Sequence, residues 1–258
     1  MIEVDSITFR YAESETPIFQ DFSWHLTGQT TCSILGPSGC GKSSLLYLLA
    51  GLLSAEKGSV TVNNELILRP RPESGLILQE YGLLPWATVR ENVALGLKIR
   101  GFYGPDGTHA PAQMPPEKEW LDRVDGWLAR LGLIQLADKY PSQLSGGQRQ
   151  RTAIARTLVL NPDTLLMDEP FSSLDAPTRE NLQELIVSLC NDHGITLVLV
   201  THSIEEAAFV GNEILLLNQP PNQEATILIN NDADNTDYRH SESYRALCLS
   251  LRDMMGMR

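Results

Sequence analysis

A run of residues near the N-terminus has the composition of a loop that binds phosphate groups. It reads Gly36-Pro37-Ser38-Gly39-Cys40-Gly41-Lys42-Ser43 and continues into Ser44. The glycines permit positive φ angles, so consecutive backbone N–H groups can point at phosphate oxygens. Lys42 would reach the β- and γ-phosphates of a nucleotide, and the Ser43 hydroxyl would bind Mg²⁺. The pattern of this P-loop, residues 36–43, predicts a site for a nucleoside triphosphate.

The flanking residues supply the elements that such a loop needs. Thr31-Cys32-Ser33-Ile34-Leu35 predicts a buried strand before it, and Leu45-Leu46-Tyr47-Leu48-Leu49 predicts a helix after it. The helix N-terminus adds a partial positive charge beside the phosphates. A glycine-rich turn without function is the alternative, and the strand and helix on either side disfavour it.

A second candidate phosphate-binding helix end lies further along the chain. Leu144-Ser145-Gly146-Gly147-Gln148-Arg149-Gln150-Arg151 opens a stretch whose apolar residues follow helical spacing. Ser145 and the two glycines would stand at the N-terminus of that helix, where free N–H groups favour an anion.

Two carboxylates follow a predicted strand. Thr164-Leu165-Leu166-Met167 is apolar enough for a buried strand, and Asp168 and Glu169 come directly after it. One carboxylate is suited to hold Mg²⁺ through water, and the other to polarise an attacking water.

With these motifs the chain resembles the ATP-binding cassettes, which are the ATPase subunits of ABC transporters. LSGGQRQR resembles the family's signature and LLMDEP its second acidic motif. Ser173-Leu174-Asp175 resembles the loop after that motif, and Thr201-His202 resembles the switch histidine. The likeness extends from about Ile2 to Leu217 in the family's order.

The resemblance implies a role for each motif residue. Glu169 would be the general base or water-orienting group, and His202 the sensor of the γ-phosphate. Ser43, Gln79 and Asp168 would form the Mg²⁺ shell, and Gln79 would also act with the catalytic residues by orienting water. Tyr11 would stack on the adenine of ATP, with a tyrosine that merely caps a strand as the alternative.

The resemblance also implies that two copies pack head to tail as a homodimer. The helix start of one copy would then cover the γ-phosphate held by the P-loop of the other. In that arrangement the residues that bind the partner's nucleotide are Ser145, Gly146, Gly147, Gln148 and Asp175.

The expected fold class is α/β, a P-loop NTPase of the ABC-ATPase type. It has a mostly parallel central sheet, an N-terminal antiparallel β-subdomain and an inserted α-helical subdomain over about 84–160. Residues 1–229 would form one ATPase domain, and residues 230–258 a linker and a short helix. Alternating apolar residues over 2–9 and 19–26 agree with antiparallel strands, and the unbroken run 195–200 predicts a central parallel strand.

Local patterns place the remaining elements. Short strands are expected at 60–62, 66–68, 76–78, 213–217 and 225–229. Thr88 and Glu91 predict a capping box that opens a helix, and Asp175 predicts the N-cap of a helix that ends at Gly194. A helix is expected from Trp120 to Gly132. Arg100 to Glu119 reads as a loop without an assigned role.

The segment Leu84-Pro85-Trp86 resembles the corresponding loop in importers of nitrate, sulfonate and taurine type. These residues would be apolar and exposed, and therefore suited to dock a cytoplasmic helix of a permease. Packing beneath the helical subdomain is the alternative, and it is stronger for Leu84 than for Trp86.

Composition limits the classes of partner and compartment. The formal net charge of −12 argues against nucleic acid, since nucleic-acid binders present basic surfaces. No apolar run approaches the roughly eighteen residues needed to span a bilayer, and no signal-peptide pattern begins the chain. We expect a protein on the cytoplasmic face of the plasma membrane that associates with it through partners, without inserting.

The cysteines, Cys32, Cys40, Cys190 and Cys248, show neither zinc-site nor disulfide spacing. Cys40 lies within the P-loop at a helix N-terminus, where a thiol is expected to be unusually acidic. Alkylation of this thiol would then block ATP hydrolysis, and bound ATP would protect it.

The resulting functional expectation is an ATPase that powers import of nitrate, sulfonate, taurine or a related solute. Its partners would be permease subunits and, through them, a solute-binding protein. An exporter ATPase, a cassette that acts on non-transport partners, and a binding module without hydrolysis remain as alternatives.

Overall fold

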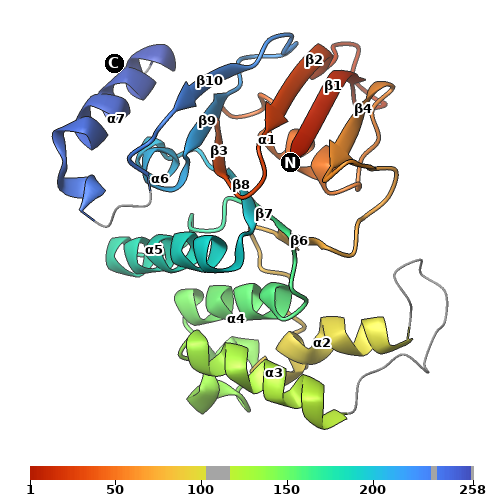
Figure 1. Ribbon diagram of the computed structural model, residues 1–258, viewed down its shortest axis with the longest axis vertical. Helices are drawn as coiled ribbons and strands as arrows, with labels where there is room; N and C mark the ends of the chain where they lie inside the picture. The colour runs from red at the N-terminus through yellow and green to blue at the C-terminus, as the bar shows by residue number, and fades with distance from the viewer. Residues whose placement is uncertain (103–116, 234–236, 257–258) are drawn as a thin grey trace.

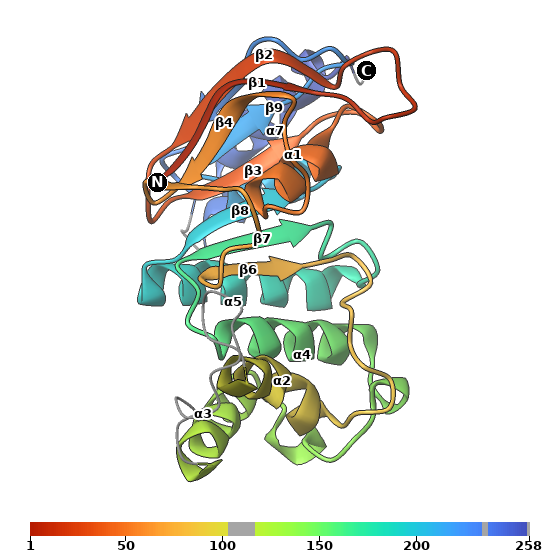
Figure 2. The same ribbon diagram turned by 90° about the vertical axis from the view of Figure 1, so that its right-hand side faces the viewer.

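The computed structural model describes residues 1–102, 117–233 and 237–256. Within them the strands form two sheets (Figures 1 and 2). The four-stranded sheet has the order β2-β1-β4-β5. Its members are β1 (Ile2–Phe9), β2 (Phe19–Leu26), β4 (Lys57–Val62) and β5 (Glu65–Leu66). All its pairs are antiparallel, which confirms the expected N-terminal antiparallel sheet.

The six-stranded sheet has the order β10-β9-β3-β8-β7-β6. Its members are β3 (Thr31–Leu35), β6 (Ser74–Ile77), β7 (Thr164–Asp168), β8 (Thr196–Val200), β9 (Glu213–Leu216) and β10 (Thr226–Ile229). Every pair is parallel except β9 with β10. The strands β3, β7 and β8 are buried throughout, as their unbroken apolar sequences require. Their carboxyl ends therefore meet at one edge of the sheet.

The described helices lie around these sheets. They are α1 (Lys42–Leu49), α2 (Val89–Phe102), α3 (Glu117–Arg130), α4 (Gly146–Leu158), α5 (Ala176–His193), α6 (Ile204–Val210) and α7 (Glu242–Met254), with short 3₁₀ turns at Ile134–Leu136, Pro141–Gln143 and Tyr238–His240. Figure 1 shows α2, α3 and α4 at one end of the molecule, with α5 between α4 and the central sheet. At the other end α7 lies close to α6, against which it packs.

The core consists of separate apolar clusters. One joins α1 to the inner faces of both sheets, through residues such as Phe22, Leu46 and Val198. Another fills the space between the central sheet, α5 and the helices α2–α4. A smaller cluster anchors α7 through Cys248 and Leu251. The P-loop helix is therefore fixed from two sides by packing.

Local capping chemistry agrees with the sequence. The Thr88 backbone N–H donates to Glu91 at 2.8 Å, and the Glu91 N–H donates back to the Thr88 hydroxyl at 3.3 Å. Asp175 caps α5 by accepting from the Thr178 N–H, and Gly194 ends α5 with a left-handed φ of 63°. These contacts confirm the predicted ends of α5 and the predicted start of α2.

Several predicted boundaries were wrong. The strand expected at 66–68 is only Glu65–Leu66, since its registered pairs with β4 are Glu65 with Val62 and Leu66 with Thr61. The strand expected at 76–78 is Ser74–Ile77, since its pairing with β7 stops at Ile77. The loop expected from 100 to 119 was wrong at both of its ends, because α2 continues to Phe102 and α3 begins at Glu117. Residues 103–116 lie outside the described residues.

Over the described residues, each helix is too short or too polar to span a bilayer.

Candidate functional site

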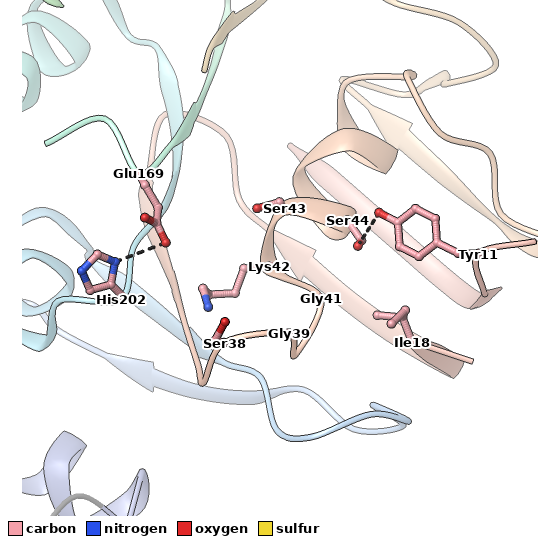
Figure 3. A pocket seen from close by; sticks show the side chains of 10 residues that line it. All are labelled: Tyr11, Ile18, Ser38, Gly39, Gly41, Lys42, Ser43, Ser44, Glu169 and His202. Atoms are coloured by element: carbon pink, nitrogen blue, oxygen red, sulfur yellow. Dashed lines mark hydrogen bonds and ion pairs between the residues drawn. The ribbon is translucent and has the colours of Figure 1, made fainter. Parts of the chain in front are cut away.

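A cavity of about 390 Å³ lies at the P-loop, next to the carboxyl ends of β7 and β8 (Figure 3). Lys42 lies between a pair formed by Glu169 and His202 and a pair formed by Tyr11 and Ser44. The described residues that line the cavity are Tyr11, Ile18, Ser38, Gly39, Gly41, Lys42, Ser43, Ser44, Glu169 and His202. The structure thus gathers residues from five separate parts of the sequence.

The P-loop backbone requires glycine at particular positions. Gly39 and Gly41 have φ angles of 78° and 106°, which side chains rarely tolerate. A Cβ at Gly41 would also lie 2.4 Å from a methyl carbon of Ile18. Gly36 and Pro37 line the inner turn, where their carbonyls accept hydrogen bonds from the Lys42 ammonium at 2.9 and 3.0 Å. The Lys42 ammonium is therefore held by carbonyls of its own P-loop.

Tyr11 stands at the edge of the cavity. Its side chain is 44% exposed, and Phe9 contacts the ring edge to face at 5.1 Å between centroids. Its hydroxyl is 3.0 Å from the Ser44 hydroxyl, which ties it to the first turn of α1. The aromatic ring is thereby placed beside the phosphate-binding loop without being buried.

Glu169 and His202 form a close pair across neighbouring strands. Glu169 Oε1 lies 3.2 Å from His202 Nδ1. Glu169 has a φ of 44°, an uncommon conformation for a residue other than glycine. Its carbonyl accepts from the Ser172 hydroxyl at 3.0 Å and its N–H donates to Val200 at 2.9 Å. These bonds hold the backbone in a turn that directs the carboxylate into the cavity.

Asp168 faces α1 behind the cavity. It accepts hydrogen bonds from the hydroxyls of Ser43 and Tyr47, each at 3.0 Å. Burial first, and then the Asp168 carboxylate, raise the pKa of Tyr47. Sequence reasoning missed Tyr47, although it lies four residues after Ser43 and therefore on the same helix face. It also missed Ile18, for which no sequence signal was available.

The oxygen donors beside the P-loop suit a magnesium ion. Mg²⁺ is usually bound by one or two protein oxygens together with waters and substrate phosphates. The Ser43 hydroxyl and the Asp168 carboxylate, 3.0 Å apart, offer such oxygens. Gln79 is more distant from this pair: it is exposed, its amide donates to the Ser172 hydroxyl at 3.5 Å, and it is not among the described residues lining the cavity.

The second predicted helix end forms a separate surface. Ser145 caps α4 and, with Gln148, makes the reciprocal hydrogen bonds of a capping box. Gly146 approaches Ser173 and Leu174, and a Cβ at Gly147 would lie 2.6 Å from a methyl carbon of Thr178. The N-termini of α4 and α5 are thus neighbours. The described residues that line the cavity at the P-loop do not include Ser145–Gln148 or Asp175.

The prediction that the Cys40 thiol is unusually acidic was wrong. Cys40 is fully buried, and burial raises the pKa of its thiol despite the lowering effect of Lys42. The neighbouring ammonium and the helix N-terminus do not compensate for the loss of solvation. Burial thus opposes the acidity that was expected of the Cys40 thiol.

The segment expected to dock a partner is exposed only in part. Trp86 is 74% exposed, whereas Leu84 is half-buried, which favours the packing alternative for Leu84. The reason is the buried Asn92 side chain, which bonds to both the N–H and the carbonyl of Leu84. Pro85 and Trp86 therefore form the exposed tip of a fixed turn.

Comparisons with known proteins agree with this geometry. The family model described as ABC transporter matches residues 19–172. The taurine import ATP-binding protein of Pseudomonas aeruginosa is 39% identical over 219 residues, covering 85% of this chain and 78% of that protein. The aliphatic sulfonates import ATP-binding protein of Bacillus cereus is 34% identical over 235 residues, covering 89% and 86%.

A solved structure is also similar. It is a dimeric post-hydrolysis ATP-binding cassette bound to ADP and phosphate, with a TM-score of 0.74 and 30% sequence identity. The match covers 89% of this chain and 98% of that one. Taken with the P-loop cavity and the acidic strand end, these matches show that the chain belongs to the ABC transporter family and is one of its ATPase cassettes.

Proposed function

We propose that this cassette powers an importer of taurine, an aliphatic sulfonate, nitrate or a related small solute. It would work as a homodimer on the cytoplasmic face of the plasma membrane, bound to permease subunits that receive solute from a solute-binding protein. The names of the similar import proteins support the solute class. The observation that carries the mechanism is the separation of the two phosphate-binding helix ends within one chain.

We propose these roles for the cavity residues. The P-loop amides and Lys42 bind the phosphates of ATP, and Tyr11 stacks on its adenine. Glu169 orients or deprotonates the attacking water, and His202 contacts the γ-phosphate. The 3.2 Å contact between these two side chains supports a shared task at one reacting group.

Ser43, Asp168 and Gln79 are proposed to hold Mg²⁺, which would supply charge neutralisation at the phosphates. Ser43 and Asp168 are already adjacent, and the Tyr47 hydroxyl leaves one Asp168 oxygen directed at Ser43. Gln79 would have to leave Ser172 to join them.

The surface formed by Ser145–Gln148 and Asp175 is proposed to complete the site of a second copy. An N-terminal helix end with a serine and two glycines attracts anions, yet in its own chain it does not line the cavity at Lys42. Head-to-tail pairing would supply it with the partner's γ-phosphate. The dimeric form of the similar cassette supports this arrangement.

The domain organisation is proposed on the same basis. Residues 1–229 would be one ATPase domain, within which residues 84–160 form the subdomain that carries Trp86 and the α4 N-terminus. Residues 230–258 would be an appended linker and helix. Trp86 would contact the permease, and its large apolar side chain on a fixed, exposed turn supports this role.

Complementation between defective copies tests the composite site. A Lys42→Ala chain and a Ser145→Arg chain are each expected to lose hydrolysis. A mixed dimer contains one intact pocket, so random pairing should restore about a quarter of the native rate. If both chains fold and associate but the mixture stays inactive, the proposal of shared sites is wrong.

Copurification tests the import proposal separately. A tagged chain should bring down permease subunits and a solute-binding protein, and mass spectrometry of the latter should detect a small anion or sulfonate. A permease that functions without a solute-binding protein and expels its substrate would contradict import.

A further inference from the structure

The connection between β9 and β10 reaches the P-loop through one buried side chain. Asn222 is 3% exposed. Its amide nitrogen donates to the carbonyl of Cys40 at 2.9 Å and to the carbonyl of Ile18 at 3.3 Å. Its amide oxygen accepts from the N–H of Asn218 at 2.8 Å. The Asn222 side chain therefore links the P-loop, the residue before β2 and the turn from Asn218 to Asn222.

The bond to Cys40 has a consequence for the next N–H group. A trans peptide is planar, so the carbonyl of Cys40 and the N–H of Gly41 point in opposite directions. Asn222 holds the carbonyl on one side, which directs the Gly41 N–H to the other. Gly41 lines the cavity, whereas Asn222 is not among the described lining residues. The amide of Asn222 thus aims a phosphate-binding N–H.

This orientation is needed because Gly41 has wide backbone freedom. Its φ of 106° is accessible to glycine, and glycine can leave it at little cost. Ile18, the second carbonyl partner of Asn222, supplies the methyl group that packs against Gly41. Asn222 therefore holds the Cys40–Gly41 peptide through the Cys40 carbonyl. Through the Ile18 carbonyl it also holds the residue that packs against Gly41.

The main chain at Asn222 is held independently of its side chain. Its N–H donates to Ile18 at 2.9 Å, and its carbonyl accepts from Gln20 at 2.9 Å. Substitution of the side chain should leave these bonds in place. If substitution of the Asn222 side chain weakens nucleotide binding, the cause can therefore be distinguished from loss of the main-chain contacts at Asn222.

We propose that Asn222 is a positioning residue of the nucleotide site, which it serves by fixing the Cys40–Gly41 peptide from outside the cavity. It lies beyond the part of the chain that matches the family model, which ends at residue 172. The proposal depends on ATP binding alone, and not on dimer formation, import or the solute.

The chain contains a matched control in Asn230. It is 5% exposed, its amide nitrogen donates to the carbonyls of Ala208 and Gly211 at 2.8 and 3.0 Å, and its oxygen accepts from the Tyr238 hydroxyl at 2.9 Å. Asn222 and Asn230 thus share burial and hydrogen-bond pattern. The partners of Asn230 are not among the described residues that line the cavity.

The test compares Asn222→Asp with Asn230→Asp in the full chain. Each change replaces an amide donor by a carboxylate that faces two carbonyl oxygens, and both should lower the unfolding temperature. Only Asn222→Asp should raise the Kd for ADP, measured by calorimetry, by about five- to thirty-fold. Its KM for ATP should rise more than its kcat falls.

Asn222→Ala serves where the aspartate variant does not fold. It removes the donor without adding charge, so the Kd for ADP should rise by a smaller factor in the same direction. Hydrogen exchange of a peptide covering 36–43 should become faster in this variant, and not in Asn230→Ala. A folded Asn222→Ala chain with unchanged Kd would overturn the proposal, as would an equal rise in Kd in the Asn230 variants.

Discussion

His202 Nδ1 and Glu169 Oε1 lie 3.2 Å apart, although the two residues follow different strands. The last registered pair between β7 and β8 is Asp168 with Val200, so the chain places Glu169 and His202 just past the same sheet edge. Ligands of open parallel sheets bind at that edge. The left-handed φ of Glu169, held by Val200 and Ser172, completes the approach.

Glu169→Gln should separate nucleotide binding from hydrolysis. The amide keeps the size of the side chain but can neither accept a proton nor carry the negative charge that polarises water. We expect phosphate release to fall by at least about a hundredfold, with the Kd for ATP nearly unchanged. In the presence of ATP, this variant should then accumulate as a stable dimer, which size-exclusion chromatography would detect. Hydrolysis at the native rate would contradict the role of Glu169.

Cys40 should resist alkylation. Its thiol is buried and its pKa is raised, so the thiolate population near neutral pH is small. We expect iodoacetamide to leave ATP hydrolysis intact over a time that fully modifies a free thiol. Mass spectrometry of the peptide containing Cys40 provides the measurement. Rapid, ATP-protected labelling of this peptide would show that the thiol opens to solvent.

Local signals predicted the elements around the site well, because their physical causes lie within a few residues. The capping box of Thr88 and Glu91, the position of Ser145 at a helix N-terminus and the helix end at Gly194 are examples. The parallel order β3, β8, β7 also agrees with the buried apolar runs that predict central strands.

Contacts between distant residues could not be predicted in this way. Asn222 meets Cys40 across 182 positions, and nothing in the pattern around either residue indicates the contact. The positive φ of Glu169 likewise depends on Val200, which belongs to another strand.

Trp86→Ala should weaken coupling to the permease without affecting basal hydrolysis. A large exposed aromatic residue at the centre of an interface can contribute about 2 kcal/mol to binding, so we expect roughly thirtyfold weaker binding to the permease and correspondingly weaker stimulation. Leu68→Ala is the control, because Leu68 is 76% exposed and lies away from this turn, beyond β5. Stimulation assays in proteoliposomes measure the effect. Equal losses in both variants would count against a specific docking role for Trp86.

The Arg71–Asp163 pair should make stability depend on pH in the acidic range. Two guanidinium nitrogens of Arg71 donate to the two carboxylate oxygens of Asp163, each at 2.6 Å, and join the segment before β6 to the loop before β7. Burial raises the pKa of Asp163, but hydrogen bonds from Arg71 and Thr164 lower it more, so the pKa lies below its ordinary value of 3.8. The folded state thus favours the charged carboxylate.

The sign of the effect follows from that shift. The pair stabilises the fold fully above the ordinary pKa of 3.8 and loses this contribution as pH falls through the lower folded value. Because the Asp163 side chain is 38% exposed, solvent screening limits the contribution to about 1 kcal/mol. Urea unfolding of the native chain and Asp163→Asn should therefore differ most near neutral pH and converge once the pH falls below the lowered pKa of Asp163 in the folded state. A difference that stays constant over this range would mean that Asp163 stabilises the fold without its charge.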